Sequence, residues 1–259
     1  MAIANKLTFV VVTCSKDLLL LSRYLRSLVT HCNRDDLEEV LLIFNDHYKY
    51  LPEFESVVQQ FSMLPIRHLW SNSIWPEQSA YDWQSQQQLK IIVAELVRTE
   101  WYVINDSKDF YFGNLVYNDF VNAQGQSMLQ ALPIHDPEDA WFGPNSHHRS
   151  QYEHAYDLMK LRFTEHSVAL RTREASVCPC HTHTVQSMIT YLKQQCGALF
   201  PHLLMLQINH KAMFTEYALM SAWLEKNDLL LKQYRLHSSR EGFLIKVSCN
   251  KDLRRGKQL

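Results

Sequence analysis

The sequence predicts an α/β protein with a mostly parallel central sheet and helices on both faces. Short continuous apolar runs alternate with longer segments in which apolar residues recur at helical spacing. A continuous apolar run is typical of a strand that is buried on both faces, as the strands of parallel sheets are. The chain has 259 residues, enough for one large domain or two small ones, and 46% of them are hydrophobic, which argues against disorder.

The first strand is expected at residues 7–13, where Val and Phe leave no polar face. Strand and helix then alternate along the first half of the chain, which is the order that builds a parallel sheet. Expected helices cover residues 18–28, 52–61, 152–163, 184–196 and 213–227, expected strands cover 40–44, 66–69, 101–104 and 243–247, and a long loop is expected at 133–150.

Charge and cysteine content exclude several classes of protein. The 26 basic and 27 acidic side chains give a net charge of −1, so bulk charge does not drive binding to nucleic acid. The 6 cysteines have no regular spacing, which indicates reduced thiols in a cytoplasmic protein rather than a secreted disulfide framework. No apolar run reaches the roughly 18 residues of a membrane-spanning helix, so neither a span nor a signal peptide is expected.

Residues 81–112 hold the most informative pattern, a helix followed by a strand with a polar end. Ser79 and Asp82 stand at capping-box spacing, so the helix is expected to begin there. The apolar strand at 101–104 ends in Asn-Asp-Ser-Lys-Asp at 105–109. Ligands gather at the carboxyl ends of strands in open α/β sheets. We therefore expect a polar helix face and this acidic strand end to form one site.

Two blocks resemble a family of bacterial proteins with a GT-A-type glycosyltransferase fold, associated with surface polysaccharide and lipopolysaccharide synthesis. Many of its members are catalogued only as a domain of unknown function. The first block is QQxxK at 86–90, followed by the strand and Asp-x-Lys-Asp at 106–109, and the second is Phe-Thr-Glu-Tyr at 214–217. The resemblance implies one GT-A-like domain over residues 1–259, with the nucleotide bound by about 1–120 and the acceptor by about 121–259.

The resemblance also implies an activity, the transfer of a sugar from a nucleotide-sugar donor to a bacterial polysaccharide or lipid-linked glycan acceptor. Two other functions fit the same fold. A nucleotidyltransferase is disfavoured because Thr13-Cys14-Ser15 is not a glycine- and arginine-rich phosphate loop. A non-catalytic sugar-binding or assembly subunit with a degenerate site stays open because of Lys108, and donor binding without turnover would reveal it.

Asp106 is expected to anchor the diphosphate of the donor. Sugar transfer requires this leaving group to be stabilised, usually by a divalent cation that carboxylates hold. The usual GT-A signature is Asp-x-Asp, but here Lys108 occupies the second position and Asp109 follows it. Along a regular strand Asp106 and Asp109 point to opposite faces, so both reach one Mn²⁺ or Mg²⁺ only if the chain turns. Alternatively, Lys108 pairs with phosphate directly, which leaves metal dependence open.

Four further residues are candidate contacts to the donor or substrate. The layout of the resembled family implies Thr13 and Asp46, which follow the first two strands; the alternatives are a plain strand residue and a turn former. Gln87 and Lys90 are candidate contacts to sugar hydroxyls or phosphate, and otherwise they belong to an exposed helix face. Trp83, on the same stripe, would either stack on a sugar or pack in the core.

Glu216 is the candidate catalytic carboxylate. An inverting transferase needs a base within hydrogen-bond reach of the acceptor hydroxyl. At a helix start a carboxylate also interacts favourably with the helix dipole, which is the structural alternative for Glu216.

The segment CPCHTH at 178–183 has the residue types of a zinc site but not its spacing, because such sites complete their ligand set from a distant segment. We expect an extended segment that ends near Pro179 and a helix that Thr184 helps to start. The resemblance places this segment near the acceptor, which makes His181 a candidate substrate contact.

Other basic or histidine residues give weaker signals. His-His-Arg at 147–149 would clamp phosphate or a sugar carboxylate, or stay solvated in a loop. His237 is a weak candidate metal ligand. The basic tail at 251–257 would contact an anionic membrane surface peripherally, or fray into solvent.

Overall fold

A computed structural model describes residues 3–76, 78, 81–133, 147–164, 167–170, 177–196, 214–236 and 247–249. The chain forms two compact units. The first contains Met1–Val121, Thr172–Thr182 and Leu244–Leu259, and the second contains Asn122–Arg171 and His183–Phe243. Most of the predicted loop at 133–150, the start of the strand predicted at 243–247, His237 and the basic tail lie outside the described residues.

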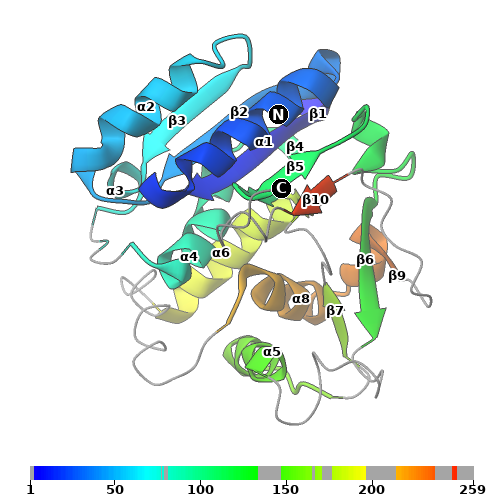
Figure 1. The fold of residues 1–259 in the computed structure, drawn as a ribbon. Helices are drawn as coiled ribbons and strands as arrows, with labels where there is room; N and C mark the ends of the chain where they lie inside the picture. Colours follow the sequence, from blue (N-terminus) through cyan, green and yellow to red (C-terminus); the bar gives the residue numbers. More distant parts are fainter. Residues whose placement is uncertain are drawn as a thin grey trace. The chain divides into compact units, whose positions relative to one another are not determined.

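The first unit is built on a five-stranded sheet in the order β3-β2-β1-β4-β8. Figure 1 labels the four strands from β3 to β4. Four strands are parallel: β1 (Ile3–Thr13), β2 (Leu37–Phe44), β3 (Ile66–Trp70) and β4 (Thr99–Asp106). β8 (Cys178–His181) runs antiparallel to β4. The chain proceeds from β1 to β2 and β3 on one side, and then crosses to the other side of β1 as β4. The strand order therefore reverses between β1 and β4, which is where open α/β sheets bind ligands.

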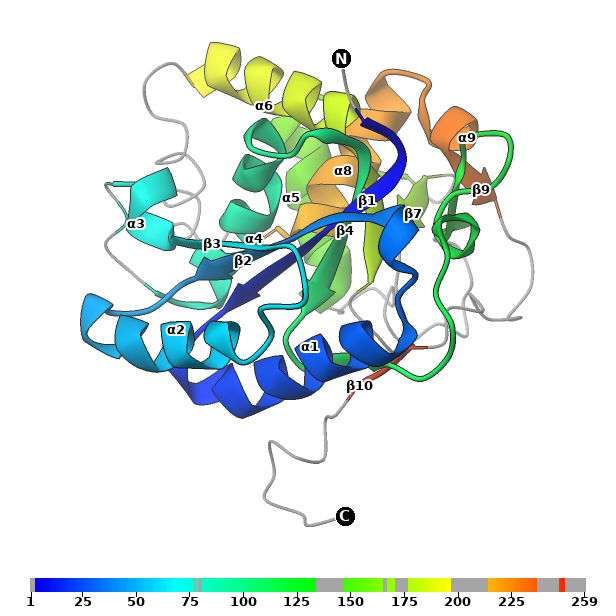
Figure 2. The same ribbon diagram turned by 90° about the horizontal axis from the view of Figure 1, so that it is seen from above.

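Helices cover both faces of this sheet. α1 (Leu18–His31) and α2 (Leu51–Gln59) lie on one face and α4 (Trp83–Ile92) lies on the other (Figure 2). The short α3 (Ser71–Ile74) follows β3. The predicted fold class, an α/β protein with a mostly parallel sheet and helices on both faces, is confirmed. Short 3₁₀ helices occupy Ser15–Asp17, Arg34–Asp36, Tyr48–Tyr50, Val93–Glu95 and Tyr117–Asp119.

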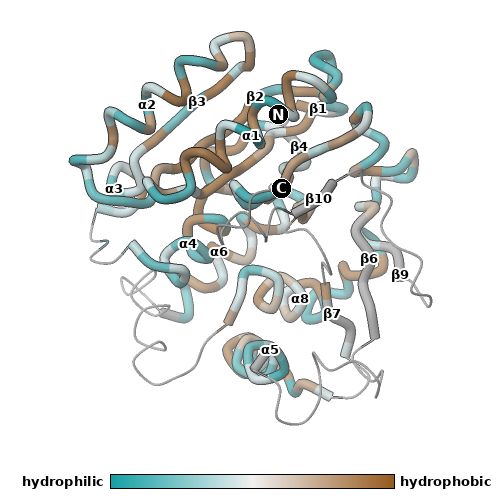
Figure 3. Tube along the Cα trace, viewed as in Figure 1, coloured by the Kyte–Doolittle hydropathy of each residue, from teal (hydrophilic) through white to brown (hydrophobic). Residues whose placement is uncertain are grey.

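The core of the first unit lies along β1, β2 and β4, whose side chains are almost all buried. Figure 3 shows the hydrophobic colour running along β1 and β2. The ring of Phe9 meets the rings of Tyr111 and Phe120 edge to face, at centroid distances of 5.9 and 5.4 Å. Tyr111 belongs to β5 (Asp109–Tyr111), which pairs antiparallel with β10 (Val247–Cys249).

The second unit has its own three-stranded sheet in the order β7-β6-β9. Its strands are β6 (Ser127–Pro133), β7 (Val168–Leu170) and β9 (Tyr234–Leu236), and its helices are α5 (His147–Leu158), most of α6 (Thr182–Cys196), α8 (Glu216–Lys226) and α9 (Leu230–Gln233). Tyr156 in α5 donates its phenol proton to Glu225 in α8 at 2.6 Å. No described helix is long and apolar enough to cross a bilayer.

Several helix boundaries differ from the prediction. α5 begins at His147 rather than at 152, so the predicted loop is wrong at its carboxyl end. An ion pair between Arg149 and Glu153, one turn apart at 2.9 Å, supports this extra turn. α8 begins at Glu216 because Thr215 caps it, accepting the Ala218 amide at 3.1 Å.

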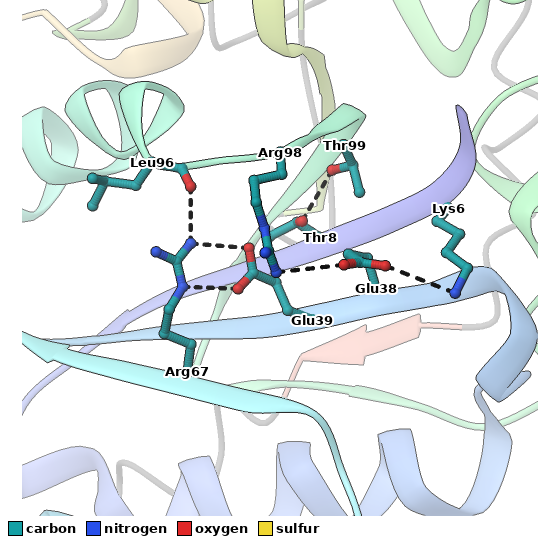
Figure 4. A network of polar contacts seen from close by, with 8 residues as sticks. All are labelled: Lys6, Thr8, Glu38, Glu39, Arg67, Leu96, Arg98 and Thr99. Carbon is teal, nitrogen blue, oxygen red and sulfur yellow. Dashed lines mark hydrogen bonds and ion pairs between the residues drawn. The ribbon is translucent and has the colours of Figure 1, made fainter. Parts of the chain in front are cut away.

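A network of ion pairs lies toward the amino ends of the parallel strands (Figure 4). Arg67 binds the buried Glu39 carboxylate through two nitrogens, at 2.8 and 2.9 Å, and also donates to the Leu96 carbonyl at 2.9 Å. Glu38 pairs with Lys6 at 3.7 Å and with Arg98 at 3.4 Å, and the side chain of Arg98 is 65% exposed. The side chain of Glu39 is 5% exposed and that of Arg67 is 37% exposed, so this pair joins a buried carboxylate to a half-buried guanidinium and is better aligned than the pairs of Glu38.

Replacing Arg67 by methionine should lower the free energy of unfolding by about 3 kcal/mol, because the buried Glu39 carboxylate loses its counter-ion. The exposed pair offers a matched control: Arg98→Met should cost less than about 1 kcal/mol. Urea unfolding followed by circular dichroism measures both. Equal losses in the two variants would contradict the structural importance of Arg67.

Candidate active site at the carboxyl edge of the parallel sheet

The amino end of α4 is fixed by its own cap and by β2. Asp82 is the N-cap: its Oδ1 accepts the Ser85 amide at 2.8 Å, and Ser85 Oγ accepts the Asp82 amide at 3.0 Å. The capping box is therefore Asp82–Ser85, not Ser79–Asp82 as predicted, and Ser79 lies outside the described residues. Asn45, which follows β2, donates to Ser85 Oγ at 3.1 Å. This bond attaches the start of α4 to the carboxyl end of β2.

Two more bonds attach α4 to the next two strands. Gln86 Nε2 donates to the carbonyl of Val12 in β1 at 2.8 Å. One turn further on, Lys90 Nζ donates to Oδ1 of Asp106, the last residue of β4, at 2.8 Å. Residues four apart lie on the same face of a helix. The polar side of α4 is thus bonded to the carboxyl ends of β2, β1 and β4 in turn.

Asp106 lies between two ammonium groups. Its Oδ1 accepts from Lys90, and its Oδ2 accepts from Lys108, which stands in the turn after β4. The side chains of Lys90, Asp106 and Lys108 are 2%, 17% and 22% exposed. We call these three residues the lysine–carboxylate cluster. Two cations and one anion leave the cluster one positive charge in excess, at the point where the strand order reverses.

This pairing fixes the charge of Asp106. Burial alone raises the pKa of its carboxyl, but the Lys90 and Lys108 ammonium groups outweigh burial and hold that pKa well below its usual value. Asp106 therefore stays ionised at physiological pH and is a poor proton acceptor. Its contribution to chemistry is electrostatic.

The predicted Mn²⁺ or Mg²⁺ site does not fit these side chains. The chain does turn after Asp106, as a shared ion would require, but Asp109 Oδ2 accepts the Asp106 amide at 3.0 Å. A cation on Asp106 would have to displace the ammonium of Lys90 or Lys108 and then repel it. No group of three or more metal-ligating side chains occurs among the residues that the structure describes.

Thr13 and Asp46, the other predicted donor contacts, lie at the same edge. Thr13 ends β1, is fully buried, and its Oγ1 has no hydrogen-bond partner within the described ranges. Asp46 accepts the Ser15 amide at 3.0 Å, the Ser15 hydroxyl, and the His47 amide at 2.7 Å. Burial raises the pKa of Asp46, but these hydrogen bonds more than offset it and lower the pKa. Asp46 thus holds the loop after β1, and its contact with a donor stays a prediction.

Comparisons with known proteins place the chain in a family. The model of the family of unknown function DUF6492 matches residues 5–246. The chain belongs to this family. The predicted likeness to a family catalogued without a function is confirmed to that extent. No curated protein sequence matches the chain.

Solved structures that are similar to this DUF6492 chain share little sequence with it, and two of those described next are named as glycosyltransferases. They include the bifunctional glycosyltransferase WbbM (TM-score 0.47, 8% identity, 90% of this chain and 39% of that one) and the galactosyltransferase LgtC with donor and acceptor sugar analogs (TM-score 0.46, 8% identity, 83% and 69%). S. aureus TarS 1-349 matches at TM-score 0.31 and 13% identity, over 41% of this chain and 28% of that one. The DUF6492 chain thus spans well under half of TarS and WbbM. Likenesses this distant do not bear on activity.

Three residues of α4 that were predicted to contact the donor or substrate differ in solvent exposure. Gln87 and Lys90 are both buried, so the exposed helix face that was their alternative is excluded. Trp83 is 46% exposed, which excludes the core position considered for it. Stacking of Trp83 on a sugar and contact of Gln87 with substrate stay predictions.

His181 is not brought to this edge. The antiparallel register pairs it with Trp101, five residues before Asp106 in β4, which is about 16 Å at 3.3 Å per residue. Its ring packs on Trp101 at 5.2 Å, and Nε2 lies 3.8 Å from Glu100 Oε1. The register therefore places His181 away from the carboxyl end of β4, and its contact with a substrate stays a prediction. The extended segment also continues past Pro179 to His181, and α6 begins two residues earlier than expected.

Glu216 lies in the second unit, as the first residue of α8, and is fully buried. Its position matches the helix-start alternative, and its catalytic role stays a prediction. His148 and Arg149, expected in a loop, lie in α5, where Arg149 pairs with Glu153.

The sequence analysis missed Ser15, Asn45 and Ser85, which hold this edge together. Each follows a strand or starts a helix, and such polar positions are the available signal. Their partners lie 31 to 40 residues away, and no local pattern reveals them.

The lowered pKa of Asp106 predicts the stability of the protein in acid. An ionised Asp106 stabilises the folded state fully above its unfolded pKa, near 4, and this contribution is lost as pH falls toward its lower folded pKa. The free energy of unfolding of the wild type should therefore fall more steeply below about pH 5 than that of Asp106→Asn. At pH 7 the variant should be about 1–3 kcal/mol less stable.

Urea unfolding between pH 3 and pH 7 measures this difference, with Asp157→Asn on the exposed face of α5 as the control. Parallel pH profiles for the wild type and Asp106→Asn would contradict the ion pairing described here.

Proposed function

We propose that the chain is a glycosyltransferase that moves a sugar from a nucleotide-sugar donor to a hydroxyl group of a glycan. The observation that carries the proposal is the lysine–carboxylate cluster at the point where the strand order reverses. Lysine ammonium groups pair well with phosphate oxygens, and ligands of open α/β sheets bind at this point. The blocks at 86–90, 106–109 and 214–217, which resemble a glycosyltransferase family, support the same reading.

Aromatic side chains at the same edge support a nucleotide rather than a bare phosphate. Tyr48 and Trp70, which follow β2 and end β3, have ring centroids 5.3 Å apart, and Tyr48 is 64% exposed. The rings of His47 and Tyr81 lie 4.9 Å apart. Exposed aromatic rings offer a flat surface for a base or a sugar. Donor base and diphosphate would thus lie along neighbouring strand ends.

The proposed reaction exchanges one bond at the anomeric carbon for another. The bond to the diphosphate oxygen breaks, and the nucleoside diphosphate leaves with the electron pair. The acceptor oxygen forms the new bond, and its proton passes to a carboxylate, for which Glu216 is our candidate. Asp106 does not take this proton because its pKa is held too low. Lys90 and Lys108 stabilise the charge of the leaving diphosphate.

The acceptor and the location belong to the same proposal. The sequence resemblance favours a bacterial polysaccharide or a lipid-linked glycan, made on the cytoplasmic side of the membrane. The basic residues at 251–257 would give peripheral contact with anionic lipid.

Differential scanning fluorimetry with UDP-, GDP- and dTDP-linked sugars tests the donor. One class should raise the melting temperature, with about 2.7 kcal/mol of stabilisation at a hundred times its Kd. CMP-linked sugars, which have no diphosphate, serve as the control. Release of nucleoside diphosphate in the presence of acceptor should then be lost in Glu216→Gln while the thermal shift remains. No shift with any nucleotide sugar would contradict the proposed function.

The Thr13 hydroxyl, which has no hydrogen-bond partner among the residues that the structure describes, predicts a variant in which nucleotide affinity and stability change separately. Thr13→Val removes a buried polar atom without a partner, so stability should stay equal or rise by up to about 1 kcal/mol. Nucleotide affinity should fall by about 10-fold if the hydroxyl meets the donor.

Thr8, near the amino end of the same strand, provides the matched control for Thr13. Its Oγ1 accepts from Thr99 Oγ1 at 2.9 Å. Thr8→Val should therefore lose about 1 kcal/mol of stability and keep its nucleotide affinity. Calorimetric titration measures the nucleotide affinity of both variants, and urea unfolding measures their stability. Wild-type affinity in Thr13→Val would show that Thr13 does not contact the donor.

A further inference from the structure

We propose that the ammonium group of Lys90 is the resident cation of this site and replaces a divalent metal ion in binding the donor diphosphate. The inference rests on the proposed function and deepens it, because it states how the diphosphate is held. It predicts that nucleotide binding needs no metal ion.

The first step of the argument is that Lys90 is fixed. Its side chain is 2% exposed, and its Nζ lies 2.8 Å from Asp106 Oδ1. One turn earlier, Gln86 bonds α4 to the Val12 carbonyl. Burial and this ion pair hold the ammonium at the end of β4, where a metal-dependent enzyme would hold its ion.

The second step is that Asp106 acts on Lys90 rather than on a metal. Each oxygen of Asp106 accepts from an ammonium group, so a divalent cation bound to this carboxylate would be repelled by two neighbouring positive charges. The carboxylate of Asp109, the second predicted ligand, instead accepts the backbone amide of Asp106 through Oδ2. Asp106 is thus a positioning residue that neutralises and orients Lys90.

The third step is that the side chains of the two lysines differ in solvent exposure. Lys108 lies in the turn between β4 and β5, and its side chain is 22% exposed against 2% for Lys90, so it is the lysine of the two that a ligand can reach from solvent. When a diphosphate arrives, Lys108 can move from Asp106 to a phosphate oxygen while Lys90 still neutralises Asp106. No buried charge is left unpaired during this exchange, which would otherwise be costly. Lys90 is the fixed cation and Lys108 the movable one.

Calorimetric titration of the full chain with UDP and with GDP, in EDTA and in Mn²⁺, tests the proposal. We expect the preferred nucleotide to bind with a Kd that differs by less than about 3-fold between the two conditions. Lys90→Met should weaken binding at least about 10-fold, and Lys108→Met about 10-fold, because each removes a charge-assisted contact. Lys6→Met, which removes an ion-paired lysine near the amino end of β1, should leave the Kd unchanged.

The outcomes separate this inference from the proposed function. Binding that occurs only with Mn²⁺ would overturn the resident cation and leave the glycosyltransferase proposal intact. Absence of binding by any nucleotide or nucleotide sugar in either condition would overturn both. Circular dichroism checks that Lys90→Met folds. If it does not fold, the comparison of EDTA with Mn²⁺ in the wild type and in Lys108→Met decides, and metal-dependent binding in either contradicts the proposal.

Discussion

The ion pair between Lys90 and Asp106 is the contact on which the carboxyl edge of the first unit depends. A buried ammonium is tolerated only beside an anion, so the last residue of β4 and the third turn of α4 must meet. Once they meet, Gln86 reaches the Val12 carbonyl and Asn45 reaches Ser85. One helix is thereby fixed across the ends of three strands, and the lysine–carboxylate cluster lies where the strand order reverses.

The same arrangement explains why the edge suits an anionic ligand. Two carboxylates at this edge accept hydrogen bonds from the backbone: Asp46 holds the loop after β1, and Asp109 holds the turn after β4. The thiol of Cys14 stays protonated, because burial and the nearby Asp17 raise its pKa to about 11. Among the described residues named here, Asp46 and Asp109 are engaged in hydrogen bonds and Cys14 is neutral, whereas the partly exposed Lys108 presents an ammonium group.

Much of the fold could be predicted because strands buried on both faces must be apolar throughout. β1, β2 and the apolar centre of β4 follow from this rule, and the polar residues after them follow from the geometry of strand ends, whereas β3 is a half-exposed edge strand that carries Arg67 and His68. The position of α4 could not be predicted in detail. Helical periodicity separates a polar stripe from an apolar one, but it does not reveal that the polar stripe faces strand ends. Gln87 and Lys90 are buried for that reason.

Other features could not be predicted for similar reasons. The antiparallel direction of β8 places His181 opposite Trp101, away from the carboxyl end of β4. The sequence does not state the direction of a strand that begins 72 positions after its neighbour ends. The extra first turn of α5 carries an ion pair between Arg149 and Glu153, four residues apart, which is a local signal that the prediction of a loop overlooked.

A crystal structure of the chain with a nucleoside diphosphate, grown in EDTA, would test the central claim most directly. The account predicts phosphate oxygens within hydrogen-bond distance of Lys108 between the ends of β1 and β4, with Lys90 still paired to Asp106. A diphosphate bound elsewhere, or a Lys90 side chain that has left Asp106, would contradict it.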